Sequence, residues 1–401
     1  MENRKHFTLN APLLATLYFF GRYFIFLGLV GGSLYGAGDL ERYFEIASLK
    51  GAPFFSYWME YPPVFPFINY LVFHLAGGNH FYFDLILFFL LTLFGSACIY
   101  FFYKIACEIW GEEGGRVRSL LYLALLLPLP YTWWYYEPIP VVMMLAALWF
   151  IHRSRSNTAA GWIGLGILTK WFSALLLPAI WRFRSWREAL KITLVSLGVT
   201  FLTFVGLWIA SPQMTEASLV SQPGRNSWQT VWAWMDGNLM NGKIADPQDR
   251  YDPNFVFNGL RGNPAVIPSW ARLIVFGGLG LFLFLKVKVK TFHSMLSFVG
   301  ITWAVFLLWS SGWSPQWILY LVPLILLTFP LKQGLYWNLG LIFLTLVEWP
   351  FLLAHTLFEF MGPIALIRSI MLIFLTIGWY RFTQNETTET NLLPESARNP
   401  V

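Results

Sequence analysis

The chain has 401 residues, of which 57% are hydrophobic and only 12% are charged, and its net charge is +6. Soluble globular proteins carry about 25% charged residues, so this composition excludes a soluble enzyme and indicates an integral membrane protein. The 38 Phe, 21 Trp and 18 Tyr residues are typical of aromatic belts at membrane interfaces. Most of the 27 Lys and Arg residues lie at the ends of apolar segments, which argues against a nucleic-acid partner and indicates membrane topology.

Apolar runs able to cross a bilayer, which takes about 20 residues, follow one another along the chain. We expect spanning helices at 12–34, 83–106, 117–134, 138–152, 189–210, 269–288, 291–311, 316–331, 335–353 and 363–381. Residues 159–183 have Lys170 near their centre and basic residues on both sides, which favours two short helices that enter the membrane and return. The predicted fold is therefore an all-α, polytopic membrane domain with about 12 membrane segments.

The basic residues also predict the orientation of the chain. Lys and Arg concentrate on one side of the predicted spans, which places both termini in the cytoplasm. Two long loops, at about 35–82 and 211–268, then lie outside the plasma or inner membrane. The first apolar run is long and lacks a cleavage pattern, so no signal peptide is expected. Residues 1–382 are predicted to form one domain, and the polar tail 383–401 is expected to be disordered.

Cysteines and acidic clusters give no framework for a metal or a disulfide. Cys98 and Cys107 lie nine residues apart in one predicted helix and therefore point to opposite faces. Asp246, Asp249 and Asp252 recur at a spacing of three, whereas calcium-loop ligands alternate at a spacing of two. We therefore expect no metal site and no cofactor.

The first outer loop places a carboxylate directly beyond the first span. Asp39 precedes a short amphipathic segment, 40–49, that has the pattern of an interfacial helix. Two interpretations of Asp39 remain open, because Asp also caps helix N-termini. Glu60 stands just before a second helix that begins at Pro63, where the helix dipole alone would favour a negative charge. The apolar run 63–76 is too short to span and is expected to lie along the membrane face.

Four sequence features occur in a fixed order along the chain. They are Asp39 after the first span, "EYPPVFPF" (60–67), "GLGILTKWFSALLLP" (164–178) and "SPQWILYLVPLILL" (314–327). This ordered set resembles the GT-C superfamily of glycosyltransferases, and within it the polyprenol-phosphate-mannose-dependent mannosyltransferases. The resemblance implies an inverting enzyme that moves a hexose, with mannose expected, from a polyprenyl-phosphate carrier to a lipid or glycan acceptor at the outer face.

The chemistry of such a transfer assigns roles to individual residues. One carboxylate must take the proton of the acceptor hydroxyl, and Asp39 is the candidate base. A departing phosphate needs cationic groups, for which Lys170, Arg225 and Arg261 are the candidates, with Arg272 beside them. A structural Lys and ordinary membrane-edge arginines are the alternatives. The remaining expected substrate contacts are Glu60, Tyr61, Gln316 and Trp317.

A multi-span transporter or a flippase for lipid-linked sugars is the alternative from another class, and a noncatalytic subunit of a glycan-assembly complex is a third. A transporter would concentrate polar residues in the middle of its spans. Here only a few charged residues, such as Arg22 and Lys170, fall within apolar segments. Glu348 and Arg368 lie in adjacent late spans, where simple ion pairing is the expectation.

Overall fold

The computed structural model describes residues 9–29, 38–222, 225–239, 245–258 and 262–392. Within these ranges the fold is all-α and contains no β-strand, only isolated bridges. In the described part of the chain, seven helices are long and apolar enough to cross a membrane. The protein is therefore an all-α membrane protein. The spanning candidates are α1 (Ala11–Leu29), α4 (His80–Leu126), α8 (Trp186–Ala210), α12 (Ser269–Lys286), α13 (Phe292–Trp309), α15 (Leu331–Leu346) with η5 (Val347–Leu352), and α16 (Met361–Leu392).

α4 consists of two helical arms that meet at Gly111, where the backbone leaves the helical region with φ 70° and ψ 175°. The second arm packs back on the first, since the rings of Phe102 and Tyr122 stack with their centroids 4.3 Å apart. Two helices were predicted here, and the second was expected to reach 134. It ends at Leu126 instead, because Pro128 and Pro130 follow and cannot continue a helix.

Shorter helices form the buried centre of the bundle. α5 (Pro138–His152) and α14 (Ile318–Thr328) are apolar almost all round and nearly every residue in them is buried, as expected for helices surrounded by others. Next to α5 lie α6 (Ser156–Thr169) and η2 (Trp171–Leu176), while α7 (Leu177–Phe183) follows η2 and packs on α13. Lys170 lies between α6 and η2, so short helical segments flank this lysine as predicted, and their entry into the membrane stays a prediction.

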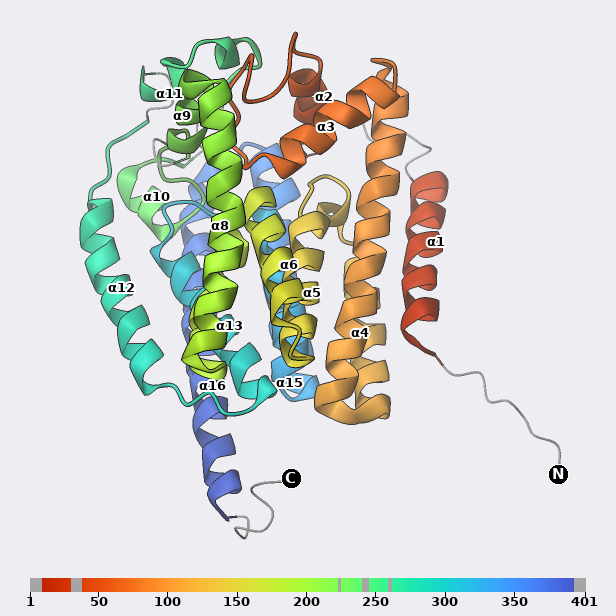
Figure 1. The fold of residues 1–401 in the computed structure, drawn as a ribbon, viewed down its shortest axis with the longest axis vertical. Helices are drawn as coiled ribbons and strands as arrows, with labels where there is room; N and C mark the ends of the chain where they lie inside the picture. The colour runs from red at the N-terminus through yellow and green to blue at the C-terminus, as the bar shows by residue number, and fades with distance from the viewer. Residues whose placement is uncertain (1–8, 30–37, 223–224, 240–244, 259–261, 393–401) are drawn as a thin grey trace, which may run out of the picture.

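One end of the bundle carries the two long loops, and we call it the loop end. α2 (Leu40–Ala47), α3 (Val64–Leu75), α9 (Pro212–Val220) and α11 (Phe255–Asn258) lie there, at the top of Figure 1. α1 begins and α16 ends at the opposite end of the bundle (Figure 1). The remaining short elements are η1 (Pro130–Thr132), α10 (Val231–Asp236), η3 (Gln248–Tyr251), η4 (Pro315–Trp317) and η6 (Phe358–Phe360).

The two loops are joined by hydrogen bonds over a short stretch before α3. The amide of Trp58 donates to the carbonyl of Arg250 at 3.1 Å, and the amide of Met59 donates to Ser218 Oγ at 2.9 Å. The side-chain amide of Gln222 donates to the carbonyl of Glu60 at 3.1 Å. Segments far apart in the sequence therefore form one folded layer above the bundle.

The last helix, α16, reaches into the polar tail and ends at Leu392. The expected disorder of residues 383–401 stays a prediction. A helix already formed by the preceding apolar span adds one hydrogen bond for each further residue it orders, so polar residues can extend it. Residues 393–401 lie outside the described ranges.

Candidate functional site

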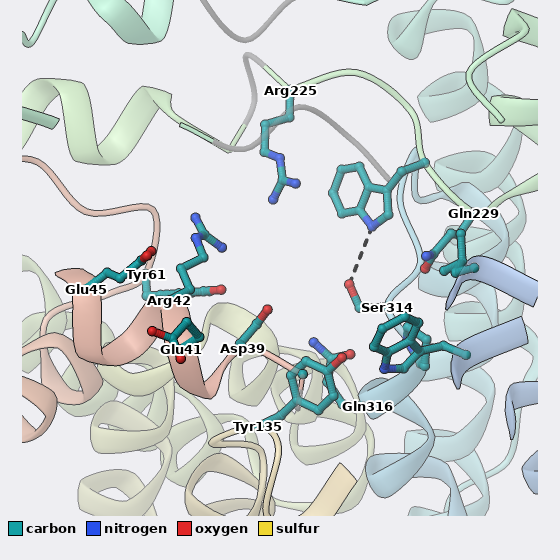
Figure 2. Close-up of a pocket in the computed structure, with 15 residues that line it drawn as sticks. Asp39, Glu41, Arg42, Glu45, Tyr61, Tyr135, Arg225, Gln229, Ser314 and Gln316 are labelled. Carbon is teal, nitrogen blue, oxygen red and sulfur yellow. Dashed lines mark hydrogen bonds between the residues drawn. The ribbon is translucent and has the colours of Figure 1, made fainter. Parts of the chain in front are cut away.

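Two adjoining cavities open at the loop end. The first, which we call the Asp39 cavity, has a volume of about 390 Å³ and a polar lining. Figure 2 shows its residues, with the side chain of Asp39 pointing into the space between α2 and the loop that carries Arg225. Its lining residues are Gly38, Asp39, Glu41, Arg42, Glu45, Tyr61, Tyr135, Arg225, Trp228, Gln229, Ser314, Pro315, Gln316, Trp349 and Leu353.

The second cavity, which we call the Lys170 cavity, has a volume of about 560 Å³. Much of its lining is apolar and aromatic, including Phe172, Leu175, Leu219, Phe306 and Trp309. Three cationic side chains also reach it, those of Lys170, Arg225 and Arg272. An apolar wall beside clustered cations suits a ligand that joins a hydrocarbon chain to an anionic group.

A partition of five residues belongs to both cavities: Tyr61, Arg225, Trp228, Ser314 and Gln316. Trp228 is fixed there by its backbone, which accepts from the amide of Trp313 at 3.1 Å and donates to the carbonyl of Ser311 at 3.0 Å. Its indole donates to Ser314 Oγ at 3.4 Å (Figure 2). A Cβ on Gly312 would lie 2.2 Å from the Trp228 ring, so a glycine is required for this close approach.

Asp39 occupies the N-cap position of α2, but its side chain makes no capping hydrogen bond. The helix-cap interpretation of this carboxylate is therefore wrong. Its own amide donates to the carbonyl of Trp134 at 3.2 Å, and the hydroxyl of Tyr43 donates to Oδ2 at 3.4 Å. Burial raises the pKa of Asp39, and the nearby Arg42 guanidinium offsets part of this rise. A carboxylate with a raised pKa that faces a cavity is suited to accept a proton.

Lys170 is not a free cation, because it forms an ion pair with Glu137 at the start of α5. The Glu137 side chain is fully buried and the lysine is 9% exposed. Glu137, which directly precedes Pro138 in an apolar segment, was not among the residues predicted from the sequence. A carboxylate inside such a segment is costly unless it is paired, and this was the signal that could have revealed it.

The predicted arginines have different surroundings. Arg225 has no carboxylate within 4 Å among the described residues, and its guanidinium lies 4.5 Å from the centre of the Trp228 ring. Arg272 is buried at the start of α12, where it donates to Ser269 Oγ at 2.8 Å. Arg261 lies outside the described residues. Arg225 is thus the predicted phosphate ligand that is both described and placed between the two cavities.

Glu60 lies at the junction of the two loops and is 5% exposed. Its Oε1 pairs with Arg42, and its Oε2 lies 2.5 Å from the guanidinium of Arg250. Burial alone would raise the pKa of Glu60, but Arg250 and Arg42 outweigh it and hold the pKa at about 2. Arg250 was not among the predicted site residues, because nothing in its local sequence connects it to Glu60.

Tyr61, Gln316 and Trp317 lie together with the other predicted residues. Tyr61 and Gln316 belong to the partition, and Trp317 lines the Lys170 cavity. The Trp317 ring meets Phe172 edge to face, with their centroids 4.9 Å apart. The buried Oε1 of Gln316 has no hydrogen-bond partner within the described part of the chain, so it is able to accept from a bound hydroxyl.

Glu348 and Arg368 form the ion pair that the sequence suggested. Arg368 also donates to the carbonyl of Gln229, which lines the Asp39 cavity. This pair therefore anchors the segment that carries Arg225 and Trp228 to η5 and α16.

Comparison with known proteins adds no relative. No family model matches the chain, and no curated protein matches it. The assignment of a function therefore rests on the cavities and on their chemistry.

Proposed function

We propose that the protein is an inverting glycosyltransferase of the GT-C type. In this proposal the donor is a hexose, with mannose expected, on a polyprenyl-phosphate carrier. The acceptor is a lipid or a glycan. The carrier phosphate binds in the Lys170 cavity and the acceptor hydroxyl in the Asp39 cavity.

One observation carries the proposal. The two cavities meet at a partition where Arg225 reaches both, while Asp39 faces only one of them and Lys170 only the other. Transfer between a phosphate-linked donor and a hydroxyl acceptor needs such a division. The leaving group requires cations on one side, and the nucleophile requires a base on the other.

The reaction follows from this arrangement. The acceptor oxygen forms a bond to the sugar C1 from the face opposite the phosphate, and the bond between C1 and the phosphate oxygen breaks. The bonding electron pair leaves with the phosphate, whose charge Arg225 stabilises. Asp39 takes the acceptor proton, so the anomeric configuration inverts and no metal is required by the balance of charges.

The membrane arrangement belongs to the same proposal. We expect about 12 membrane segments in a GT-C arrangement, with both termini in the cytoplasm and both cavities at the outer face of the plasma or inner membrane. Membrane lipids are then the surroundings of the bundle, and the donor reaches the Lys170 cavity from the bilayer. The aromatic and aliphatic side chains of that cavity, such as Trp171 and Leu219, are themselves partly exposed.

The test uses purified full-length protein in lipid nanodiscs with a panel of labelled polyprenyl-phosphate hexoses and lipid acceptors. We expect a glycosylated acceptor with inverted anomeric configuration and the release of polyprenyl phosphate. Asp39→Asn serves as the matched control. In proteoliposomes, a change in the membrane side of an intact lipid-linked sugar, without transfer, would instead support the transporter or flippase alternative.

A further inference from the structure

Asp39 and Arg42 have the spacing of a natural ion pair, yet they do not form one. Residues three apart at the start of a helix lie on the same face, and both side chains line the Asp39 cavity. No oxygen of Asp39 lies within 4 Å of the Arg42 guanidinium among the described contacts, because Arg42 pairs with Glu60 instead. The contact with Glu60 therefore holds the Arg42 guanidinium away from Asp39.

Glu60 is itself fixed by more than this one contact. Its second oxygen lies 2.5 Å from Arg250, whose side chain is 0% exposed. Arg250 in turn lies 4.8 Å from the centre of the Trp58 ring. The carbonyl of Glu60 accepts from Gln222 at 3.1 Å. Glu60 therefore cannot follow Arg42 if the arginine turns toward Asp39, and it holds the arginine at the loop junction.

We propose that Glu60 is a positioning residue that keeps Arg42 away from Asp39, so that Asp39 remains an unpaired base toward the acceptor. This inference rests on the proposed function and adds a role for a second carboxylate of the same site. The first long loop supplies Asp39, Arg42 and Glu60, and the second supplies Arg250. The contact between Glu60 and Arg250, which joins the two loops, thus leaves Asp39 free to accept the acceptor proton.

Several other groups face Asp39 and contribute to its charge balance. From α2 and the two loops these are Glu41, Arg42, Tyr43, Glu60, Tyr61 and Arg225. From the segment before α5 and from the end of α6 they are Tyr135, Glu137 and Lys170. Burial raises the pKa of Asp39, Arg42 lowers it, and the Glu60 charge raises it. Releasing Arg42 and removing the Glu60 charge therefore act in the same direction.

Glu60→Gln is the first test, read from the pH profile of kcat/KM. Asp39 must be deprotonated to act as a base, so activity rises with pH through its pKa. An arginine that pairs with a carboxylate lowers its pKa by about 1 to 3 units. We expect the acid limb of Glu60→Gln to move to lower pH by about this amount, with a lower plateau, because the base is weaker.

Arg42→Gln is the second test, and it predicts the opposite sign. It removes the competing guanidinium but leaves the ion pair between Glu60 and Arg250 in place. The acid limb should therefore move to higher pH. In the double variant Arg42→Gln/Glu60→Gln, Arg42 is absent and cannot turn toward Asp39, so relative to Arg42→Gln only the smaller downward shift from the lost Glu60 charge should remain. Glu113→Gln, which changes an exposed carboxylate on α4, is the matched control and should leave the profile unchanged.

If Glu60 acted on Asp39 through its charge alone, Glu60→Gln would shift the acid limb equally with and without Arg42, and this equality would overturn the inference. Acid limbs that stay in place, or that move in the same direction in Glu60→Gln and Arg42→Gln, would overturn the inference. Carbodiimide labelling of Asp39 against pH, quantified by peptide mass spectrometry, reads the same protonation without turnover. If no donor supports transfer but the labelling curves shift with these signs, the proposed function fails while the positioning role stands.

Discussion

The ammonium of Lys170 forms an ion pair with the carboxylate of Glu137, which is completely buried. Aromatic rings surround the ammonium, with ring centres 5.1 Å away at Tyr136, 5.3 Å at Phe172 and 5.8 Å at Trp317. A cation that already pairs with a carboxylate stabilises the charge of a bound phosphate less than an unpaired cation does. The pair therefore makes Lys170 part of the framework of the cavity as well as a candidate ligand.

Lys170→Met is expected to destabilise the protein. Removing one partner of a buried ion pair leaves an uncompensated charge and costs about 3 to 5 kcal/mol, so the thermal midpoint of unfolding should fall by several degrees. The double variant Lys170→Met/Glu137→Gln removes both charges and should recover most of this loss. Binding of polyprenyl phosphate to the double variant then isolates the contribution of Lys170 to the donor. Donor affinity equal to that of the wild type would leave Lys170 with a structural role only.

Arg225→Gln should weaken donor binding with little effect on folding. Arg225 has no carboxylate partner in the described part of the chain, so its removal leaves no buried charge unpaired. A hydrogen bond to a charged group is worth about 1.5 to 3 kcal/mol, which corresponds to a loss of roughly 10- to 100-fold in the affinity for polyprenyl phosphate. The measurement is a titration in nanodiscs, with Arg187→Gln at the opposite end of the bundle as the control. Equal affinities for the two variants would remove Arg225 from the phosphate site.

Local signals predicted α2 and α3, the two short helices of the first loop, well. α3 covers Val64–Leu75, against the expected 63–76, because Pro63 allows a helix to begin and Gly77 and Gly78 stop it. Both glycines have positive φ, 60° and 72°, which residues with a side chain adopt at a cost. Such boundaries depend on a few neighbouring residues, and the sequence displays these directly.

The contacts that define the site were not predictable in the same way. Glu137 and Lys170 are 33 residues apart, and they meet only because α5 and α6 pack side by side. The pairing of Glu60 with Arg250 likewise requires the two long loops to fold over each other. No periodicity or spacing encodes such pairs, so the sequence suggested charged residues near the site but not which of them neutralise each other.

The proposed orientation can be tested with an impermeant thiol reagent on intact cells. Cys98 is buried, so a Cys107→Ser background leaves little reaction. Glu45→Cys places an exposed thiol at the loop end, and Arg187→Cys places one at the opposite end. We expect only Glu45→Cys to be labelled without permeabilisation, as the distribution of basic residues predicts. Labelling of Arg187→Cys alone would invert the topology and put the Asp39 cavity in the cytoplasm.

The variant Asp39→Asn distinguishes a role of Asp39 as the catalytic base from a structural role of this residue. The Asp39 side chain does not cap α2, and Asn is as good as Asp at that position, so folding and donor binding should be unchanged. General base catalysis contributes roughly 10² to 10⁴ in rate, and an amide cannot take the acceptor proton. We expect kcat to fall by this factor while the affinity for polyprenyl phosphate stays constant. Asp39→Glu should also be badly impaired, because one added methylene moves the carboxylate by about 1 Å from its attacking geometry. Substantial activity in Asp39→Asn would exclude this carboxylate as the base and transfer the role to another acid in the cavity, such as Glu41 or Glu45.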